Sequence, residues 1–212
     1  MFIVEKKPQS IFAESYRTLR TNIQYSSFDK DIKIIVVTSS EAGEGKSTTA
    51  GNLALAFAEA KKRTILIDCN LRNPTLNKQF KTSGLLGLSD ILIGKNNIYS
   101  AIHKHNEYLS VMTSGTIPPN PAEMLSSRTM EKLLQELKEH FQIIILDSSA
   151  LNDYSDAQIL STKADGVILV VKARKTKRNK VFDAKALLDK VGVNLLGVVL
   201  NEVKSRKKEG KN

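Results

Sequence analysis

Apolar runs and amphipathic segments alternate along the chain from residue 32 onward. Runs that are apolar almost throughout, as expected of buried strands, occupy residues 32–38, 63–68, 109–114, 141–147, 165–173 and 194–201. Helical periodicity is found at residues 10–27, 46–62, 128–141, 156–164 and 179–191. Strands without polar alternation are covered on both faces, as in a parallel sheet between helices. The pattern therefore predicts an α/β fold with a mostly parallel central sheet and helices on both of its faces.

Chain length and composition limit the class of protein. With 212 residues the chain is long enough for one sizeable α/β domain and too short for two. Cys69 is the one cysteine, so an internal disulfide is excluded and a reducing compartment is expected. Apolar runs fall short of the ~20 residues that a bilayer span needs, and the N-terminus does not resemble a secretion signal. We expect a soluble, cytoplasmic protein.

The net charge of +10 is concentrated in residues 172–178 and 204–212. Nucleic acid, an anionic lipid surface or an acidic protein segment could each use such charge. Solvated loops and a frayed, flexible tail are the simpler interpretation, and we favour it for the tail. Because aromatic residues are not interleaved with these lysines, binding to single-stranded nucleic acid is disfavoured and no nucleic-acid partner is expected.

A glycine-rich segment, "SSEAGEGKSTT" at residues 39–49, joins the first strand to a helix. It nearly meets the pattern G-x-x-x-x-G-K-[ST], with Ser40 in place of the first glycine. A strand, a loop and a helix in this order direct backbone N–H groups at an anion, and a lysine and a serine here would reach phosphates and Mg²⁺. The predicted nucleotide-binding residues are Gly43, Glu44, Gly45, Lys46, Ser47 and Thr48. A glycine-rich helix entry with a solvated lysine is the alternative, which the flanking elements make much weaker.

Two predicted strands end in an aspartate, "ILIDCN" at Asp68 and "IIILDSS" at Asp147. In an open parallel sheet, both acids would lie at the same edge as the phosphate loop (residues 39–49). We predict Mg²⁺ ligation by Ser47, Asp68 and Asp147, and a catalytic group made of Lys46, Asp68 and Asp147, in which Asp68 is a candidate to accept the proton of an attacking hydroxyl. The alternative is that these aspartates only cap the turns or helices that follow.

The motifs together resemble those of the bacterial tyrosine kinases, which are built on a P-loop ATPase scaffold. "EAGEGKST", "ILIDCNLRNP" and "IIILDSS" are similar to the three nucleotide motifs of that family, and "SGTIPPNPAEML" is similar to its proline-rich stretch. "ESYRTLR" fits its E-x-x-R-x-x-R segment with Glu14, Arg17 and Arg20. The resemblance covers about residues 10–203. It implies a P-loop NTPase-like kinase domain at residues 31–203, a helical oligomerisation segment at residues 1–30 and a basic tail at residues 204–212.

The resemblance also implies an activity and partners. We expect ATP and Mg²⁺ as cofactors, transfer of phosphoryl groups to tyrosines of proteins, and a role in capsule or exopolysaccharide production. Glu14, Arg17 and Arg20 would form the interface of a ring-like homo-oligomer, although a solvated charged helix face is the alternative. A membrane-anchored activator would recruit the chain to the inner face of the membrane. Asn201 matches a position that contacts adenine in related ATPases, and an ordinary turn residue is an equally good interpretation.

Three features depart from the family pattern. Asn70 stands where the family has a second aspartate, which indicates natural attenuation, an introduced change or compensation by Asp68 and Asp147. Ser148 and Ser149 replace part of a Thr-Pro-Pro run, so we expect a more flexible loop after Asp147. Residues 201–212 contain no tyrosine, which predicts weak or absent autophosphorylation of the tail.

Two other functions compete with a kinase. A partition-type ATPase switch would carry an additional lysine at the start of the phosphate loop, where this chain has Glu41. A nucleotide-binding regulator without useful chemistry would be compatible with Asn70.

Overall fold

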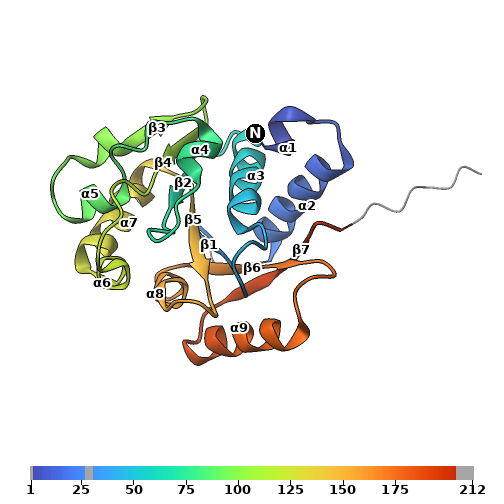
Figure 1. Ribbon diagram of the computed structural model, residues 1–212. Coiled ribbons are helices and arrows are strands. Elements are labelled where there is room, and N and C mark those ends of the chain that lie inside the picture. The colour runs from blue at the N-terminus through green and yellow to red at the C-terminus, as the bar shows by residue number, and fades with distance from the viewer. Residues whose placement is uncertain (1, 27–30, 204–212) are drawn as a thin grey trace, which may run out of the picture.

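The computed structural model describes residues 2–26 and 31–203, in which a seven-stranded sheet is flanked by helices (Figure 1). The strand order is β3-β4-β2-β5-β1-β6-β7, and all neighbouring strands are parallel except the antiparallel pair β3–β4. The strands are β1 (Ile34–Ser39), β2 (Thr64–Asp68), β3 (Ile102–Lys104), β4 (Leu109–Met112), β5 (Ile143–Ala150), β6 (Gly166–Lys172) and β7 (Leu195–Asn201). This arrangement confirms the predicted α/β class and the mostly parallel sheet.

Helices cover both faces of the sheet, also as predicted. The first group is α1 (Ile3–Lys6), α2 (Ile11–Tyr25), α3 (Lys46–Glu59) and α4 (Leu76–Phe80). The second is α5 (Leu88–Leu92), the 3₁₀-helix η1 (Ile98–Ala101), α6 (Pro121–Ser126), α7 (Arg128–His140), α8 (Asp156–Ser161) and α9 (Arg178–Lys190). Side chains alternate between the two layers, so that Ile34 packs with the second group and Ile35 packs with the first. A strand buried on both sides in this way is apolar throughout, which explains the sequence pattern.

The end of β5 contradicts the sequence-based expectation of a flexible loop after Asp147. Ser148 and Ser149 are buried and belong to the strand. The Ser148 hydroxyl donates to the main-chain oxygens of Val37 (3.2 Å) and Ser149 (3.1 Å), and the Thr38 hydroxyl donates to the same Ser149 oxygen (2.8 Å). The expectation was wrong because it treated the serines as turn residues, whereas their neighbours on β1 hold them in place.

The other departures from prediction lie at the margins of the sheet. β3 and the short helices α1, α4 and α5 were not predicted, because three to five residues carry too little periodicity. β7 lies at the edge of the sheet, where Val198 and Leu200 are more than half exposed. Among residues 2–26 and 31–203, no helix is both long and apolar enough to cross a bilayer. The predicted tail at residues 204–212 and residues 1 and 27–30 of the predicted N-terminal segment lie outside the described residues.

Candidate nucleotide site

The phosphate loop leaves the carboxyl end of β1 and enters α3. Gly45 is the N-cap of α3 with φ of +92°, and Gly43 has φ of +78°. Side-chain-bearing residues adopt this left-handed region at a cost, which explains the glycine at both places. At Gly45 a Cβ atom would also lie 2.0 Å from Nδ2 of Asn201, whereas at Gly43 it would meet nothing within 4 Å. Lys46 and Ser47 therefore open α3 at a point where the backbone is tightly constrained.

Glu44 has a structural role that the sequence did not reveal. Its buried carboxylate accepts hydrogen bonds from the Ser40 hydroxyl (2.8 Å), from the Glu41 main-chain N–H (3.1 Å) and from the Thr176 hydroxyl. Its main-chain oxygen accepts a bond from Nδ2 of Asn201 (2.9 Å). The side chain of Glu44 thus fastens the loop, and its main-chain N–H is the group that remains for a phosphate.

A cavity of about 530 Å³ opens in front of this loop. Five of the predicted nucleotide-binding residues line it, namely Gly43, Gly45, Lys46, Ser47 and Thr48. Further residues that the motif search did not assign to the site complete the wall: Ala42, Asn70, Asn73, Thr75, Gln79, Ser149, Ala150, Asp153, Tyr154 and Glu202. Most of them lie at or shortly after the ends of β2 and β5. Their closeness in sequence to Asp68 and Asp147 was the signal that could have assigned them to the site.

Asp68 and Asp147 are brought together, as predicted, because they face each other in the register of β2 and β5. Both side chains are fully buried. Asp68 is satisfied by the turn that follows it: Oδ1 accepts from the Asn70 N–H (3.2 Å), and Oδ2 accepts from the Thr75 and Leu76 N–H groups (2.9 Å each). Burial raises the pKa of Asp68, while these three bonds and Lys46 oppose the rise. Asp68 therefore shapes the loop between β2 and α4, in addition to any catalytic role.

Asp147 is in a different situation. Neither of its carboxylate oxygens has a hydrogen-bond partner within the described part of the chain. Burial and the negative charge of Asp68 raise its pKa, and Lys46 and the nearby Ser47 hydroxyl reduce the effect without completing a well-formed hydrogen bond. Buried polar atoms are rarely left unpaired unless an ion, a water or a ligand serves them. The two free oxygens beside Ser47 fit a hydrated Mg²⁺, whose ligands are hard oxygen atoms.

Asn70 is held by its own loop. Its Nδ2 donates to the main-chain oxygen of Asn73 (2.9 Å), and its Oδ1 accepts from the Asn73 N–H (3.3 Å). The side chain is buried at the cavity wall. A carboxylate could keep the second of these bonds but not the first, because an ionised carboxylate only accepts.

An ion pair links the loop after β2 to the start of α8. Arg72 donates to both carboxylate oxygens of the buried Asp156, at 2.7 and 3.0 Å. The guanidinium carbon also lies 4.1 Å from the ring centroid of Tyr154, which borders the cavity. This bidentate pair fixes the relative positions of two cavity walls, and no motif in the sequence analysis indicated it.

The predicted interface residues lie on α2, which packs along α3 (Figure 1). Arg17 is engaged within the chain, donating to Glu59 (2.9 and 3.1 Å), to Glu14 (3.1 Å) and to the main-chain oxygen of Pro8 (2.8 Å). Arg20 donates from one terminal nitrogen to the Ala56 oxygen (2.9 Å). Its Nε atom is buried and has no partner within residues 2–26 and 31–203. Their role between subunits stays a prediction.

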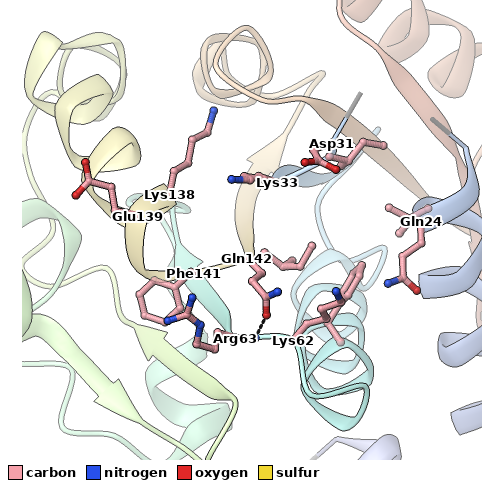
Figure 2. A pocket seen from close by; sticks show the side chains of 13 residues that line it. Gln24, Asp31, Lys33, Lys62, Arg63, Lys138, Glu139, Phe141 and Gln142 are labelled. Carbon is pink, nitrogen blue, oxygen red and sulfur yellow. Dashed lines mark hydrogen bonds between the residues drawn. The ribbon is translucent and has the colours of Figure 1, made fainter. Parts of the chain in front are cut away.

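A second cavity of about 530 Å³ lies at the amino ends of β1, β2 and β5, opposite the carboxyl ends where the phosphate loop lies (Figure 2). Figure 2 shows the cationic side chains of Lys33, Lys62, Arg63 and Lys138 around it. It contains none of the phosphate-loop residues. In parallel sheets ligands bind at the carboxyl ends of the strands, so the cavity at the phosphate loop is the candidate nucleotide site.

Comparisons with known proteins identify relatives of the chain. A family model described as an AAA domain matches residues 32–181. Tyrosine-protein kinase YwqD of Bacillus subtilis (strain 168) is 42% identical over 206 residues, covering 97% of this chain and 87% of the relative. The crystal structure of the chimerical protein CapA2B2 has a TM-score of 0.93 at 36% identity, covering 96% of this chain and 90% of that one. The kinase domain of Escherichia coli tyrosine kinase ETK also reaches 0.93, at 27% identity, covering 100% and 83%.

Proposed function

The chain belongs to the P-loop family of bacterial tyrosine kinases, and on that premise we propose that it transfers the γ-phosphoryl group of Mg·ATP to tyrosine hydroxyls of proteins. The observation that carries the proposal is the unsatisfied carboxylate of Asp147 behind the phosphate loop. A buried carboxylate without hydrogen-bond partners lowers the stability of the folded protein, and a bound metal–nucleotide complex would supply the missing positive charge and ligands. ATP and Mg²⁺ are therefore the proposed cofactors.

The residues of the phosphate loop have separate tasks in this proposal. The main-chain N–H groups from Gly43 to Thr48 and the N-terminus of α3 receive the phosphates, and Lys46 adds a positive charge next to them. Ser47 and Asp147 hold Mg²⁺ directly or through its water shell. When bound, Mg²⁺ neutralises charge that develops on the transferred phosphoryl group. The transition state of phosphoryl transfer is loose, so positioning and charge neutralisation contribute more than base strength.

Asp68 is proposed to act beside Asp147, which lies opposite it in the register of β2 and β5. Three backbone N–H groups hold its carboxylate rigidly, which leaves one lone pair on Oδ1 for a metal-bound water or for a proton from the attacking tyrosine. Asn70 adds no charge, so in this proposal Asp68 and Asp147 do without the further aspartate that the family has at position 70. Asn201 is proposed to border the base of the nucleotide, because its bond to the Glu44 oxygen places it against the phosphate loop.

The proposed partners follow from the family as well. We assign α2 to an interface between copies of the chain, to which Glu14 contributes an exposed carboxylate (64% of the side chain). Arg17 would keep its bonds to Glu59 in such an assembly and present Glu14 to a neighbour. A membrane-anchored activator would bring the ring to the inner face of the membrane, with capsule or exopolysaccharide synthesis as the regulated process.

The test is phosphotransfer to a tyrosine-containing protein in the presence of a peptide from the activator's cytosolic tail. We expect phosphotyrosine with the wild-type chain, and at least a hundredfold loss in Lys46→Met and Asp147→Asn, since each removes an interaction worth about 3 kcal/mol in the transition state. Arg174→Ala, on the exposed turn after β6, is the matched control. Hydrolysis of ATP without tyrosine modification under these conditions would favour a partition-type ATPase switch instead.

A further inference from the structure

A second unpaired polar group lies close to Asp147 on the same strand. The Oγ atom of Ser149 is buried and has no hydrogen-bond partner among the described residues. Ser149 nevertheless lines the cavity that Gly43, Lys46 and Ser47 also line. It is thus a buried hydroxyl without a partner among the described residues, on a residue that borders the cavity proposed for the triphosphate.

The backbone of β5 is irregular at this residue. Along the β1–β5 pair, Val37 lies opposite Asp147 but Ser39 lies opposite Ala150, so β5 contains one more residue than β1 in this interval. Such a bulge bends the strand and redirects side chains, and bulges are frequent beside active sites. The extra residue falls at Ser148 and Ser149, directly after the metal-binding acid.

The two serines of the bulge have divided roles. Ser148 uses its hydroxyl inside the fold, donating to the main-chain oxygens of Val37 and Ser149. The Ser149 oxygen also accepts from Thr38 (2.8 Å). Two hydroxyl donors hold the main-chain oxygen of Ser149, so its backbone is fixed and its side chain retains only rotational freedom. A group fixed in this way can meet a ligand with little loss of conformational freedom.

From this geometry we infer that Ser149 donates a hydrogen bond to the terminal phosphoryl oxygens of bound ATP and is a further residue of the phosphoryl-transfer site. The inference rests on the proposed nucleotide site and adds a residue to which the sequence motifs assigned no role in that site. A hydroxyl can serve as the donor because phosphoryl oxygens only accept. The Asp147 carboxylate nearby, an acceptor only, is left for the metal.

If the Ser149 hydroxyl serves a ligand, removing it should weaken nucleotide binding without lowering the stability of the nucleotide-free protein. In the absence of nucleotide, Ser149→Ala removes an unsatisfied buried group, so its melting temperature should equal or exceed that of the wild type. With nucleotide, it loses a bond to a charged acceptor. We expect binding of a non-hydrolysable Mg·ATP analogue to weaken about tenfold or more, and binding of Mg·ADP by less than about twofold.

The control is Ser148→Ala, which removes a neighbouring hydroxyl of the same bulge. Because that hydroxyl bonds within the fold, this variant should lower the melting temperature and leave both affinities within about twofold of the wild type. Thermal unfolding of the full chain measures the melting temperature, and calorimetric titration measures the affinities for the ATP analogue and for Mg·ADP. The inference is overturned if Ser149→Ala binds the ATP analogue as tightly as the wild type, or loses as much affinity for ADP as for the analogue. A wild-type chain that binds neither nucleotide would overturn the proposed function as well.

Discussion

Replacing Asn70 by aspartate would restore the acid that the family has at this position, and we predict that it destabilises the nucleotide-free protein. The amide Nδ2 of Asn70 donates to the Asn73 oxygen at 2.9 Å, and its Oδ1 accepts from the Asn73 N–H. In Asn70→Asp the donor becomes a second acceptor that faces the carbonyl oxygen of Asn73. The side chain is 6% exposed, so water cannot easily replace the lost bond.

The size of the effect can be worked out from these contacts. One hydrogen bond contributes about 1 kcal/mol to the free energy of unfolding, and a buried acceptor left facing another acceptor costs about 1–3 kcal/mol. The lower end of their sum, about 2 kcal/mol, corresponds to a fall in melting temperature of about 4–8 °C for a domain of this size. The loss should grow with pH, because burial and the adjacent Asp68 favour the protonated form of a carboxyl group at position 70.

Thermal unfolding of both proteins, with and without Mg·ADP, measures the prediction. Asn96→Asp, on an exposed loop, controls for the added charge alone and should change the melting temperature by less than about 1 °C. Saturating Mg·ADP should narrow the gap between Asn70→Asp and the wild type, since a cation offsets the third acid. If Asn70→Asp is as stable as the wild type without nucleotide at about pH 8, the bond between Asn70 and Asn73 does not hold the loop as described.

Three more predictions concern the walls of the site. Burial and the charge of Asp68 raise the pKa of Asp147. The nucleotide-free protein should therefore lose stability as the pH rises from the ordinary aspartate pKa of about 4 through the raised pKa of Asp147. In urea unfolding, Asp147→Asn should be more stable than the wild type at about pH 8.5 and lose this advantage near pH 5. Gly45→Ala should weaken Mg·ADP binding in calorimetry more than tenfold, through its contact with Asn201, and equal affinities for Gly45→Ala and Gly43→Ala would refute this. Arg72→Ala should lower the urea unfolding free energy by about 2–3 kcal/mol by stranding a buried carboxylate, with Arg72→Lys recovering less than half.

The sequence was informative where one residue type has one dominant use. Positive φ angles at Gly43 and Gly45 and the apolar runs ending in Asp68 and Asp147 could all be read from the chain, because glycine in a strand-to-helix turn and an acid after a buried strand have few alternatives. Ser149 could not, since a serine following a strand is usually a turn residue and only the register shift against β1 places it in the cavity wall.

The two strand-end acids look equivalent in sequence and are different in the fold. Asp68 makes the capping bonds that the alternative required, because it accepts from the N–H groups of Thr75 and Leu76. Its role in the nucleotide site stays a prediction. Asp147 caps nothing within the described residues. The two aspartates differ because the loop at residues 70–76 folds back onto Asp68. This loop is held by the bond between Asn70 and a main-chain oxygen, and it has no periodicity that a sequence pattern could detect.

The charge balance of the site gives Asn70 a physical meaning beyond the loss of an acid. Two buried carboxylates, Asp68 and Asp147, face each other, and Lys46 is the cation that lowers the pKa of both. A third carboxylate at position 70 would leave three acids against one lysine, so a nucleotide-free fold would depend more strongly on Mg²⁺ or on protons. Asparagine keeps the shape of the loop, supplies a donor to Asn73 and limits the acids to two. At the proposed Mg²⁺ site the same residue would weaken metal binding, because it supplies no charge. We therefore infer that stability without nucleotide and metal affinity are in conflict at position 70, and that asparagine favours stability.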